Sequence, residues 1–405
     1  MQKKKPDLQL KSFKLNSLLE ITNAINNNFS SNQLFLLLKF ILQNQLKIGK
    51  AMIYINSGRG WKVVMEYGLE EDEKELIDVD SLTHLYEITV LDLNKGQTLN
   101  AIDVVIPVHH KSSPLAFLLM GDIDNNEMKA SPIIKHLPFI QTLLNIIAVA
   151  IENKRLVKEV IRQERMKKEL ELASQMQNML FPSELPNNEF LEIAAIYQPH
   201  QQVGGDYYDF IQMDEEQSIF CMADVSGKGV SAALLMANFQ AHLRALVDYK
   251  TSLTEIVEIL NEKVNHNAKG EKFITFFIGR YNSSSKKLEY INAAHPPPVL
   301  VSDEVSVFLN SGCTGLGMFD IIPSIKEGSV EIESDSFLVC YTDGVIELED
   351  DRGEVFDENH LAAWLEQADS STMSEMNDAL MIKLDSHRGS LPFQDDTALF
   401  SVRFR

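Results

Sequence analysis

The sequence has few cysteines and few basic residues, and each shortage excludes a class of protein. Its 405 residues include only three cysteines, Cys221, Cys313 and Cys340, which are too few and too scattered for a disulfide framework or a cysteine zinc site. The 37 Lys and Arg are outnumbered by 58 Asp and Glu, which gives a formal net charge of −21. This balance excludes nonspecific nucleic-acid binding as the main activity, because such binding depends on a surplus of basic residues.

Long hydrophobic runs are missing as well. The longest apolar stretches, residues 35–42 and 143–151, are each interrupted by a polar residue and are far shorter than the roughly 18 residues that span a bilayer. The basic first residues lead into no apolar run, so they do not form a secretory signal. We therefore expect a cytoplasmic protein without a membrane span.

The charge that is present is unevenly distributed. Residues 1–150 carry a net charge of −1, residues 151–185 a net charge of +1, and residues 186–405 a net charge of −21. So sharp a change marks domain boundaries. We predict one domain at 1–150, a linker at 151–185 and a second domain at 186–405.

The N-terminal part alternates between two periodicities. Apolar residues recur at helical spacing through 15–48, where Ser30 and Ser31 could cap a second helical segment. Strand-like runs and a closing helix follow, at 51–56, 61–68, 101–110, 114–123 and 132–152. This order of elements resembles GAF domains, a resemblance that implies a small α+β domain that receives a small-molecule or protein signal.

Residues 140–182 predict one long helix, since neither Gly nor Pro occurs before Pro182. Its middle is dense in charges of both signs and carries only a thin apolar stripe. A stripe of this width suits a short coiled coil or a helix that docks on a neighbouring domain. We therefore expect a homodimer.

From residue 186 the pattern becomes rich in strands. Many adjacent strands with segregated pairs of helices predict an α+β fold, an antiparallel β-sandwich flanked by helices. The expected strands are 191–199, 207–213, 217–225, 272–282, 287–295, 298–302, 305–309, 329–333, 336–343 and 397–404. The expected helices are 229–248, 252–267, 358–367 and 373–386.

Four acidic sites lie at strand ends or turns in this part of the chain. They are GGD with Asp206, ADVSGKG with Asp224, YTDG with Asp343, and QDDT with Asp395 and Asp396. Two carboxylates about 4 Å apart repel by about 4 kcal/mol at an effective dielectric near 20. Converging carboxylates would therefore need cations, and Mg²⁺ or Mn²⁺ suits an oxygen-only site. The alternative is a set of independent turn aspartates, because Asp-Gly is a common turn.

The motifs GGDYYDF, ADVSGKG, NAAHPPP, YTDGVIE and DDT, in this order, resemble the metal-dependent protein phosphatases of the 2C type, in their bacterial SpoIIE/RsbU branch. The resemblance covers about residues 170–405. It implies two metal ions, with Asp224 bridging them and the Val225 carbonyl as a further ligand. It also implies that Asp206, Asp343 and Asp395 are metal ligands, and that Asp396 is an alternative ligand or supports one.

Some positions depart from the family pattern. Ser226 stands where related enzymes carry a histidine that acts as general acid, so the proton donor is not identified. Ala294 and Ser334 replace usual glycines, and neither position is a ligand. Asn292 and His295 lie in a family loop near the site. His295 has either a catalytic or a merely structural role.

The resemblance implies a protein serine/threonine phosphatase in which two-metal-activated water hydrolyses phosphoserine or phosphothreonine. By analogy with the branch, the substrate would be a phosphorylated STAS-domain antagonist of an anti-sigma factor. The alternative is a non-catalytic sensor and scaffold with a degenerate phosphatase fold. A P-loop is excluded, because Met222 and Gly229 occupy the places where that motif needs Gly and Ser or Thr.

Overall fold

The structure is a computed structural model, and it describes residues 4–58, 60–91, 101–110, 113–121, 135–248, 250–368 and 371–405. The chain forms two compact units, Met1–Glu164 and Arg165–Arg405. Each unit has its own hydrophobic core and is described by itself. Within the described residues, no helix is long and apolar enough to cross a membrane.

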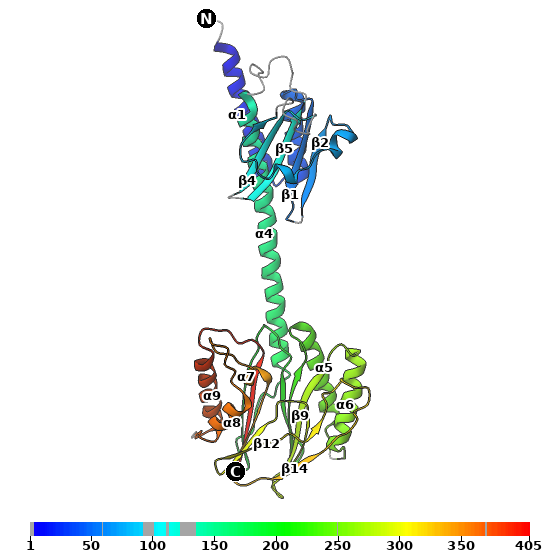
Figure 1. Cartoon of the computed structure of the whole chain (residues 1–405), viewed down its shortest axis with the longest axis vertical. Helices are drawn as coiled ribbons and strands as arrows, with labels where there is room; N and C mark the ends of the chain where they lie inside the picture. The colour runs from blue at the N-terminus through cyan, green and yellow to red at the C-terminus, as the bar shows by residue number, and fades with distance from the viewer. Residues whose placement is uncertain are drawn as a thin grey trace. The chain divides into compact units, whose positions relative to one another are not determined.

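The N-terminal unit is a five-stranded sheet with helices packed on one face (Figure 1). The strands run antiparallel in the order β2-β1-β5-β4-β3. Their bounds are Lys50–Asn56 (β1), Trp61–Tyr67 (β2), Thr89–Val90 (β3), Val104–His110 (β4) and Ser113–Gly121 (β5). The helical elements are α1 (Lys4–Asn26), α2 (Ser31–Phe40), a π-helical turn (Ile41–Gln45), α3 (Glu71–Glu75), a 3₁₀ turn (Asp80–Leu82) and the start of α4.

The helical segment expected at 15–48 is two helices, as the cap signal indicates. The Ser30 side chain accepts a hydrogen bond from the Gln33 N–H at 3.3 Å, and the Gln33 side chain accepts one from the Ser30 N–H at 2.8 Å. This capping box begins α2 and turns the chain after α1. Parts of the predicted segments 114–123 and 132–152 lie outside the described residues.

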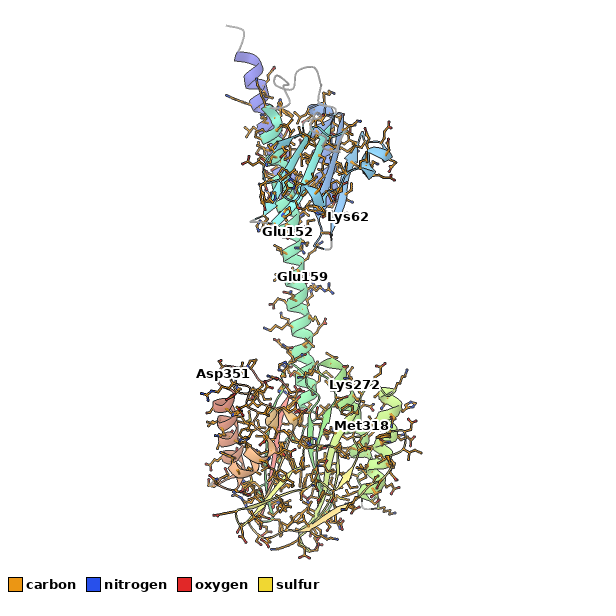
Figure 2. All side chains as sticks on the ribbon, in the orientation of Figure 1. Lys62, Glu152, Glu159, Lys272, Met318 and Asp351 are labelled. Atoms are coloured by element: carbon orange, nitrogen blue, oxygen red, sulfur yellow. The ribbon has the colours of Figure 1, made fainter. Side chains whose placement is uncertain are left out.

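Helix α4 runs from Leu137 to Asn178. The prediction of one long helix is confirmed for most of its length, but its end at 182 is wrong, because the chain leaves the helix at Met179 and turns before Pro182. Every side chain from Arg155 to Glu169 is exposed, and Glu159 is labelled among them in Figure 2. Residue 177 near the end of the helix is buried again.

The C-terminal unit is a sandwich of two sheets, and all but one of its strand pairs are antiparallel. This confirms the predicted fold class. The first sheet contains β7 (Tyr207–Gln212), β8 (Gln217–Val225), β9 (Ile274–Asn282), β10 (Lys287–Ala293), β13 (Gly312–Cys313) and β14 (Gly328–Glu331). The second contains β6 (Leu191–Gln198), β11 (Val299–Ser302), β12 (Val305–Phe308), β15 (Phe337–Tyr341) and β16 (Thr397–Phe404).

Helices cover both outer faces of the sandwich (Figure 1). Helices α5 (Val230–Leu246) and α6 (Leu253–Ala268) pack on the first sheet, and α8 (Glu358–Leu365) and α9 (Met373–Arg388) pack on the second. The short α7 (Asp343–Ile346) follows β15. A third core, which includes Phe220, Phe277 and Phe400, lies between the sheets. The strand-end loops are therefore fixed by apolar layers on both sides.

One carboxylate is buried far from the acidic motifs. Glu192 on β6 is 3% exposed. It accepts hydrogen bonds from the Met373 N–H at 2.9 Å and from Arg405 Nη2 at 2.7 Å. Burial favours its neutral acid, but these hydrogen bonds and the charges of Arg403 and Arg405 prevail and lower the pKa of Glu192. Glu192 thus joins the start of α9 to both β6 and β16.

We expect Glu192→Gln to destabilise the C-terminal unit by about 1–3 kcal/mol at pH 7, the usual cost of disrupting a buried charged hydrogen bond. A lowered folded-state pKa stabilises the fold above the unfolded value, near 4.5, and this stabilisation disappears as the pH falls through the folded value. The difference in the free energy of unfolding between the variant and wild type should therefore become smaller below pH 4.5. Urea unfolding in a Trp61→Phe background, followed by Trp364 fluorescence, measures this unit alone. A difference in unfolding free energy that does not change with pH would show that the charge of Glu192 does not stabilise the unit.

Candidate functional site

The hairpin of β7 and β8 places two of the four acidic motifs side by side. In this antiparallel pair Tyr207 lies opposite Ala223. Asp206 precedes Tyr207 and Asp224 follows Ala223, so the two aspartates meet at the same end of the hairpin. Each of the two carboxyl groups affects the pKa of the other.

The two glycines before Asp206 let its loop cross the end of β8 closely. A Cβ atom on Gly205 would lie 2.9 Å from the Val225 carbonyl oxygen, closer than a side chain tolerates. Glycine at this position therefore allows the Asp206 loop to lie directly over the Val225 carbonyl. The backbone of the expected ligand Val225 thus borders the same space as Asp206.

The second sheet contributes the other acidic motifs. Asp343 begins α7 just after β15, and Asp395 and Asp396 precede β16, the strand paired with β15. Thr342 joins the two sheets, because its hydroxyl donates to Asp206 Oδ2 at 2.8 Å and accepts from the Ala398 N–H at 2.9 Å. All the acidic motifs therefore lie at one end of the sandwich.

Asp396 binds backbone groups with both of its oxygens. Oδ1 accepts from the His200 N–H at 2.8 Å, and Oδ2 accepts from the Gly205 N–H at 2.7 Å. Its carbonyl oxygen would lie only 2.0 Å from a Cβ on Gly344, so the turn after Asp343 requires glycine. In this structure Asp396 holds the loop of Asp206 in place.

The clustered carboxylates change one another's acidity. Burial raises the pKa of Asp206 well above its usual value, and the charges of Asp224, Asp396 and Asp343 raise it further. Burial also raises the pKa of Asp224. Asp206 opposes this rise, and the negative charges of Asp395 and Asp396 add to it. Burial, then Asp224 and Asp395, raise the pKa of Asp343 to about 7. The site therefore carries more negative charge than it can stabilise by itself.

A lysine compensates part of this charge. Lys228, in the loop after Asp224, lies 2.8 Å from Asp395 Oδ2 and donates to the Gln394 carbonyl at 2.6 Å. Both side chains are partly exposed, so the pair adds little stability. Lys228 thus forms an ion pair with Asp395 in a part of the site that is open to solvent.

The residues fit a hard divalent cation by their chemistry. The donor set consists of carboxylates and one carbonyl, without Cys or His, and hard cations prefer such oxygen ligands. Within the described parts of the chain, however, no three or more His, Cys, Asp or Glu side chains are already arranged as a metal site. The side chains instead contact Thr342, Lys228 and backbone N–H groups.

Gln177 near the end of α4 also belongs to this site, although no sequence pattern singles it out. Its side chain is 6% exposed. Its Nε2 donates to the Gly204 carbonyl at 2.7 Å, and its Oε1 accepts from the Gly204 N–H at 3.2 Å. Both backbone groups of Gly204 are thus held by α4, two residues before Asp206. The apolar stripe of the helix does not include Gln177, because it is polar, like its neighbours Gln175 and Asn178.

His295 lies between the sheets. Its ring is 4% exposed and its Nδ1 lies 2.9 Å from Thr275 Oγ1. Thr275 is the cross-strand partner of Asp224. Burial lowers the pKa of His295 to about 3, so the ring is neutral near pH 7 and cannot act there as a protonated acid. This geometry favours the structural role that the sequence left open.

Hydrogen bonds between side chains and backbone groups hold two nearby loops in place. One loop carries His295, and the other carries Ser226. Asn292 Oδ1 accepts from the His295 N–H at 2.8 Å, and Ala294 between them has φ of +52°, in the region that favours glycine. Ser226 Oγ accepts from the Phe273 N–H at 2.9 Å, and Lys272 (labelled in Figure 2) donates to the Ser226 carbonyl at 2.7 Å. Ser226 therefore ties the loop after Asp224 to the start of β9.

An ion pair between a buried aspartate and a half-exposed arginine joins the hairpin to α5. Asp209 on β7 is fully buried and accepts two hydrogen bonds of 2.7 Å from Arg244 on α5 and a third from the Tyr207 hydroxyl. A bidentate pair of this kind fixes both distance and orientation. Strand β7, which follows Asp206, is thus fixed to α5, the helix that follows the loop of Asp224.

Comparison with known proteins shows what the C-terminal unit is similar to. Residues 214–405 match the model of the family described as Stage II sporulation protein E (SpoIIE). The phosphoserine phosphatase RsbU of Bacillus subtilis is 31% identical over 192 residues, 47% of this chain and 57% of that protein. The protein IcfG of a Synechocystis species is 24% identical over 394 residues, 87% of this chain and 60% of that protein.

Among solved structures, the SiaA-PP2C domain of Pseudomonas aeruginosa superposes with a TM-score of 0.54 at 18% sequence identity, over 60% of this chain and 99% of that one. This likeness confirms the fold expected from the motifs, and the family match agrees with the resemblance over residues 214–405. The chain spans less than two thirds of the length of either curated relative. The likeness of residues 1–150 to GAF domains and the boundaries at 150 and 185 stay predictions.

We expect Asp206→Asn to stabilise the protein in EDTA by about 1–2 kcal/mol, within the usual range for a stabilising substitution. The physical reason is that Asn removes a buried charge among carboxylates while it can still accept the hydrogen bond from Thr342. Thermal unfolding measures the change, with Asp378→Asn on the exposed face of α9 as the matched control. Mn²⁺ should raise the unfolding temperature of wild type more than that of Asp206→Asn. Equal stability of wild type and variant in EDTA would show that repulsion at Asp206 does not destabilise the fold.

Proposed function

We propose that this chain, whose residues 214–405 form a SpoIIE-family domain, is a metal-dependent protein phosphatase that hydrolyses phosphoserine or phosphothreonine on a regulatory protein. The observation that carries the proposal is the convergence of Asp206, Asp224, Asp343 and Asp395 at one end of a PP2C-like sandwich. The name of the relative RsbU, a phosphoserine phosphatase, supports phosphoserine as the substrate group. The cytoplasmic location and the homodimer expected from the sequence stay predictions.

Asp224 is the proposed ligand shared by two Mn²⁺ or Mg²⁺ ions, with Asp206, Asp343, Asp395 and the Val225 carbonyl as the other ligands. When bound, such ions neutralise phosphoryl oxygens and activate water for attack on phosphorus. The protein's own contribution is to hold these oxygen atoms in position. Thr342 orients Asp206, Asp396 fixes the loop before it, and Gly205 leaves the Val225 carbonyl accessible.

The second candidate is a non-catalytic sensor and scaffold with a degenerate phosphatase fold. The four acidic motifs are complete, which favours the enzyme. The proposed substrate is a phosphorylated STAS-domain antagonist of an anti-sigma factor, which rests only on resemblance to the branch. The N-terminal unit is proposed to receive a small-molecule or protein signal and to control the site through α4.

Turnover of p-nitrophenyl phosphate and of a phosphoserine protein by the full chain tests the function. We expect activity that requires Mn²⁺ or Mg²⁺, is lost in EDTA, and falls at least about 100-fold in Asp224→Asn, since disturbing a metal site costs this much or more. Asp378→Asn, at an exposed aspartate on α9 in the same unit, is the control and should match wild type. Folded, metal-loaded wild type without turnover would favour the scaffold.

The contact of α4 with the site yields a separate prediction. Gln177→Ala should lower kcat about tenfold, because losing two buried hydrogen bonds costs about 1–3 kcal/mol and frees the loop that positions Asp206. Gln177→Glu should also be impaired, since its carboxylate would face the Gly204 carbonyl. Gln175→Ala, on the exposed side of the same turn, is the matched control. Unchanged kcat in both Gln177 variants would show that α4 does not position the site.

A further inference from the structure

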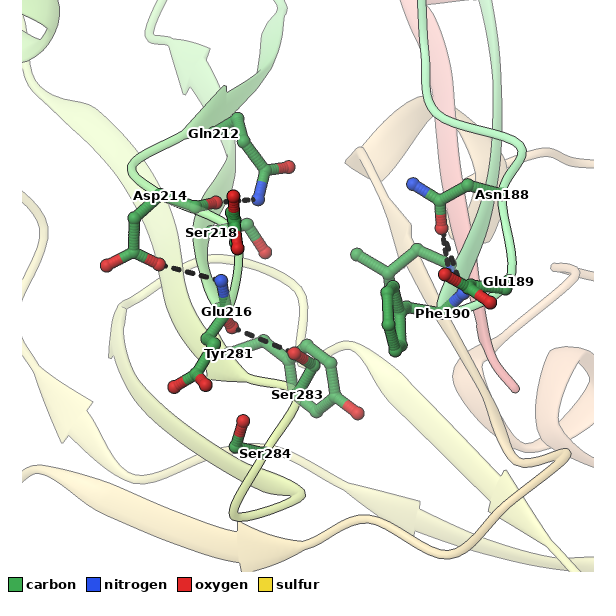
Figure 3. A pocket seen from close by; sticks show the side chains of 12 residues that line it. Asn188, Glu189, Phe190, Gln212, Asp214, Glu216, Ser218, Tyr281, Ser283 and Ser284 are labelled. Carbon is green, nitrogen blue, oxygen red and sulfur yellow. Dashed lines mark hydrogen bonds between the residues drawn. The ribbon is translucent and has the colours of Figure 1, made fainter.

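A second pocket lies at the opposite end of the sandwich from the acidic site. Its volume is about 980 Å³. Figure 3 shows its two walls, the loop before β6 with Asn188, Glu189 and Phe190, and the turns after β7 and β9 with Asp214, Glu216 and Ser283. One wall adjoins β6, the edge strand of the second sheet, and the other adjoins β7, the edge strand of the first sheet, together with its neighbours β8 and β9. The pocket is therefore at an open edge of the sandwich.

The distance from the proposed catalytic end follows from the length of one strand. Strand β8 begins at Gln217 beside the pocket and reaches Asp224 seven residues later. At about 3.3 Å per residue the two ends are roughly 20 Å apart. A ligand in this pocket would not occupy the catalytic site.

The charge of the lining has one sign. Glu189, Asp214, Glu215 and Glu216 line the pocket and are exposed, and its lining includes no Lys, Arg or His. The nearby Arg405 donates to the Asn188 carbonyl at 2.7 Å but is paired with Glu192. The pocket therefore presents unneutralised carboxylates to solvent.

The side chain of a largely buried tyrosine reaches the surface of the pocket with its hydroxyl. Tyr281 is 3% exposed, and within the described residues its hydroxyl makes no hydrogen bond. Figure 3 shows the hydroxyl end of Tyr281 directed toward the space between the walls. Phe190 on the opposite wall is 47% exposed. A cation with hydrogen-bonding and apolar parts can use all three features, since carboxylates attract it and an aromatic face favours it.

The walls are held in place without a ligand. Asp214 Oδ1 accepts from the Glu216 N–H at 2.8 Å and the Gln217 N–H at 2.6 Å, which fixes the turn after β7. The Ser283 N–H donates to the Glu216 carbonyl at 2.8 Å and so joins this turn to the one after β9. The pocket is thus already formed, and binding would cost little ordering.

We propose that this pocket binds a lysine- or arginine-bearing segment of a partner protein. The volume accommodates several side chains, and the carboxylates are spread over both walls, which suits an extended basic peptide better than a single ion. A small apolar ligand fits poorly, because the sites of such ligands are lined mostly by apolar groups. The proposal is independent of the phosphatase assignment, because it concerns binding at the far end of the unit.

Fluorescence anisotropy with labelled hexalysine and the full chain in EDTA tests the proposal, at about 0.1 M salt, where charges more than about 10 Å apart are screened. We expect Glu189→Lys combined with Glu215→Lys to weaken binding about tenfold or more. The control combines Glu258→Lys on α6 with Asp378→Lys on α9. It changes the net charge equally and should weaken binding about twofold at most. Tyr281→Phe keeps the ring and the charge and should weaken binding about threefold.

Three outcomes would overturn the proposal. Equal loss in both double variants would show that binding follows the overall charge of the protein. Unchanged binding in Tyr281→Phe would show that the pocket floor does not contact the peptide. Pocket-dependent binding of spermidine without binding of hexalysine would make the occupant a small polyamine. Turnover of p-nitrophenyl phosphate by the Glu189→Lys and Glu215→Lys variant is measured in parallel, and a loss of binding with unchanged turnover keeps the two proposals distinguishable.

Discussion

The C-terminal unit depends on one electrostatic constraint, the repulsion among carboxylates that are held together where water is scarce. Asp206, Asp224 and Asp343 all have raised pKa values because burial and their neighbours oppose their ionisation. Such an arrangement is unfavourable to the fold, so the surrounding structure must enforce it. The layers of apolar side chains between and outside the sheets provide the stability that this requires.

The carboxylates are kept close together mainly by hydrogen bonds to the backbone of the loop that precedes Asp206. Asp396 binds two N–H groups in the loop around Gly205, Thr342 links the second sheet to Asp206, and Gln177 holds both polar groups of Gly204. Behind the hairpin, the pair of Asp209 and Arg244 fixes the strand to α5. The loops that carry the carboxylates are therefore held by Asp396 of the cluster and by side chains outside it.

The sequence allowed the prediction of the sandwich, its helices and the acidic motifs, because alternating strands and aspartates at strand ends are local patterns. It did not allow the prediction of Gln177, which becomes significant only when α4 meets the loop of Gly204. It left His295 undecided, since burial between two sheets, which makes the ring neutral, is a tertiary property. The end of α4 was placed four residues too late, because the sequence contains no strong helix stop before Pro182.

The contact of Gln177 with Gly204 also bears on how a functional fragment of this protein would be chosen. The family match starts at residue 214, beyond both Asp206 and Gln177. A recombinant fragment cut at that point, or at the change in charge near residue 186, would lack the side chain that holds the Gly204 backbone. A fragment that keeps this contact includes the last turns of α4, whereas the bounds of the family match alone would place its border too far along the chain.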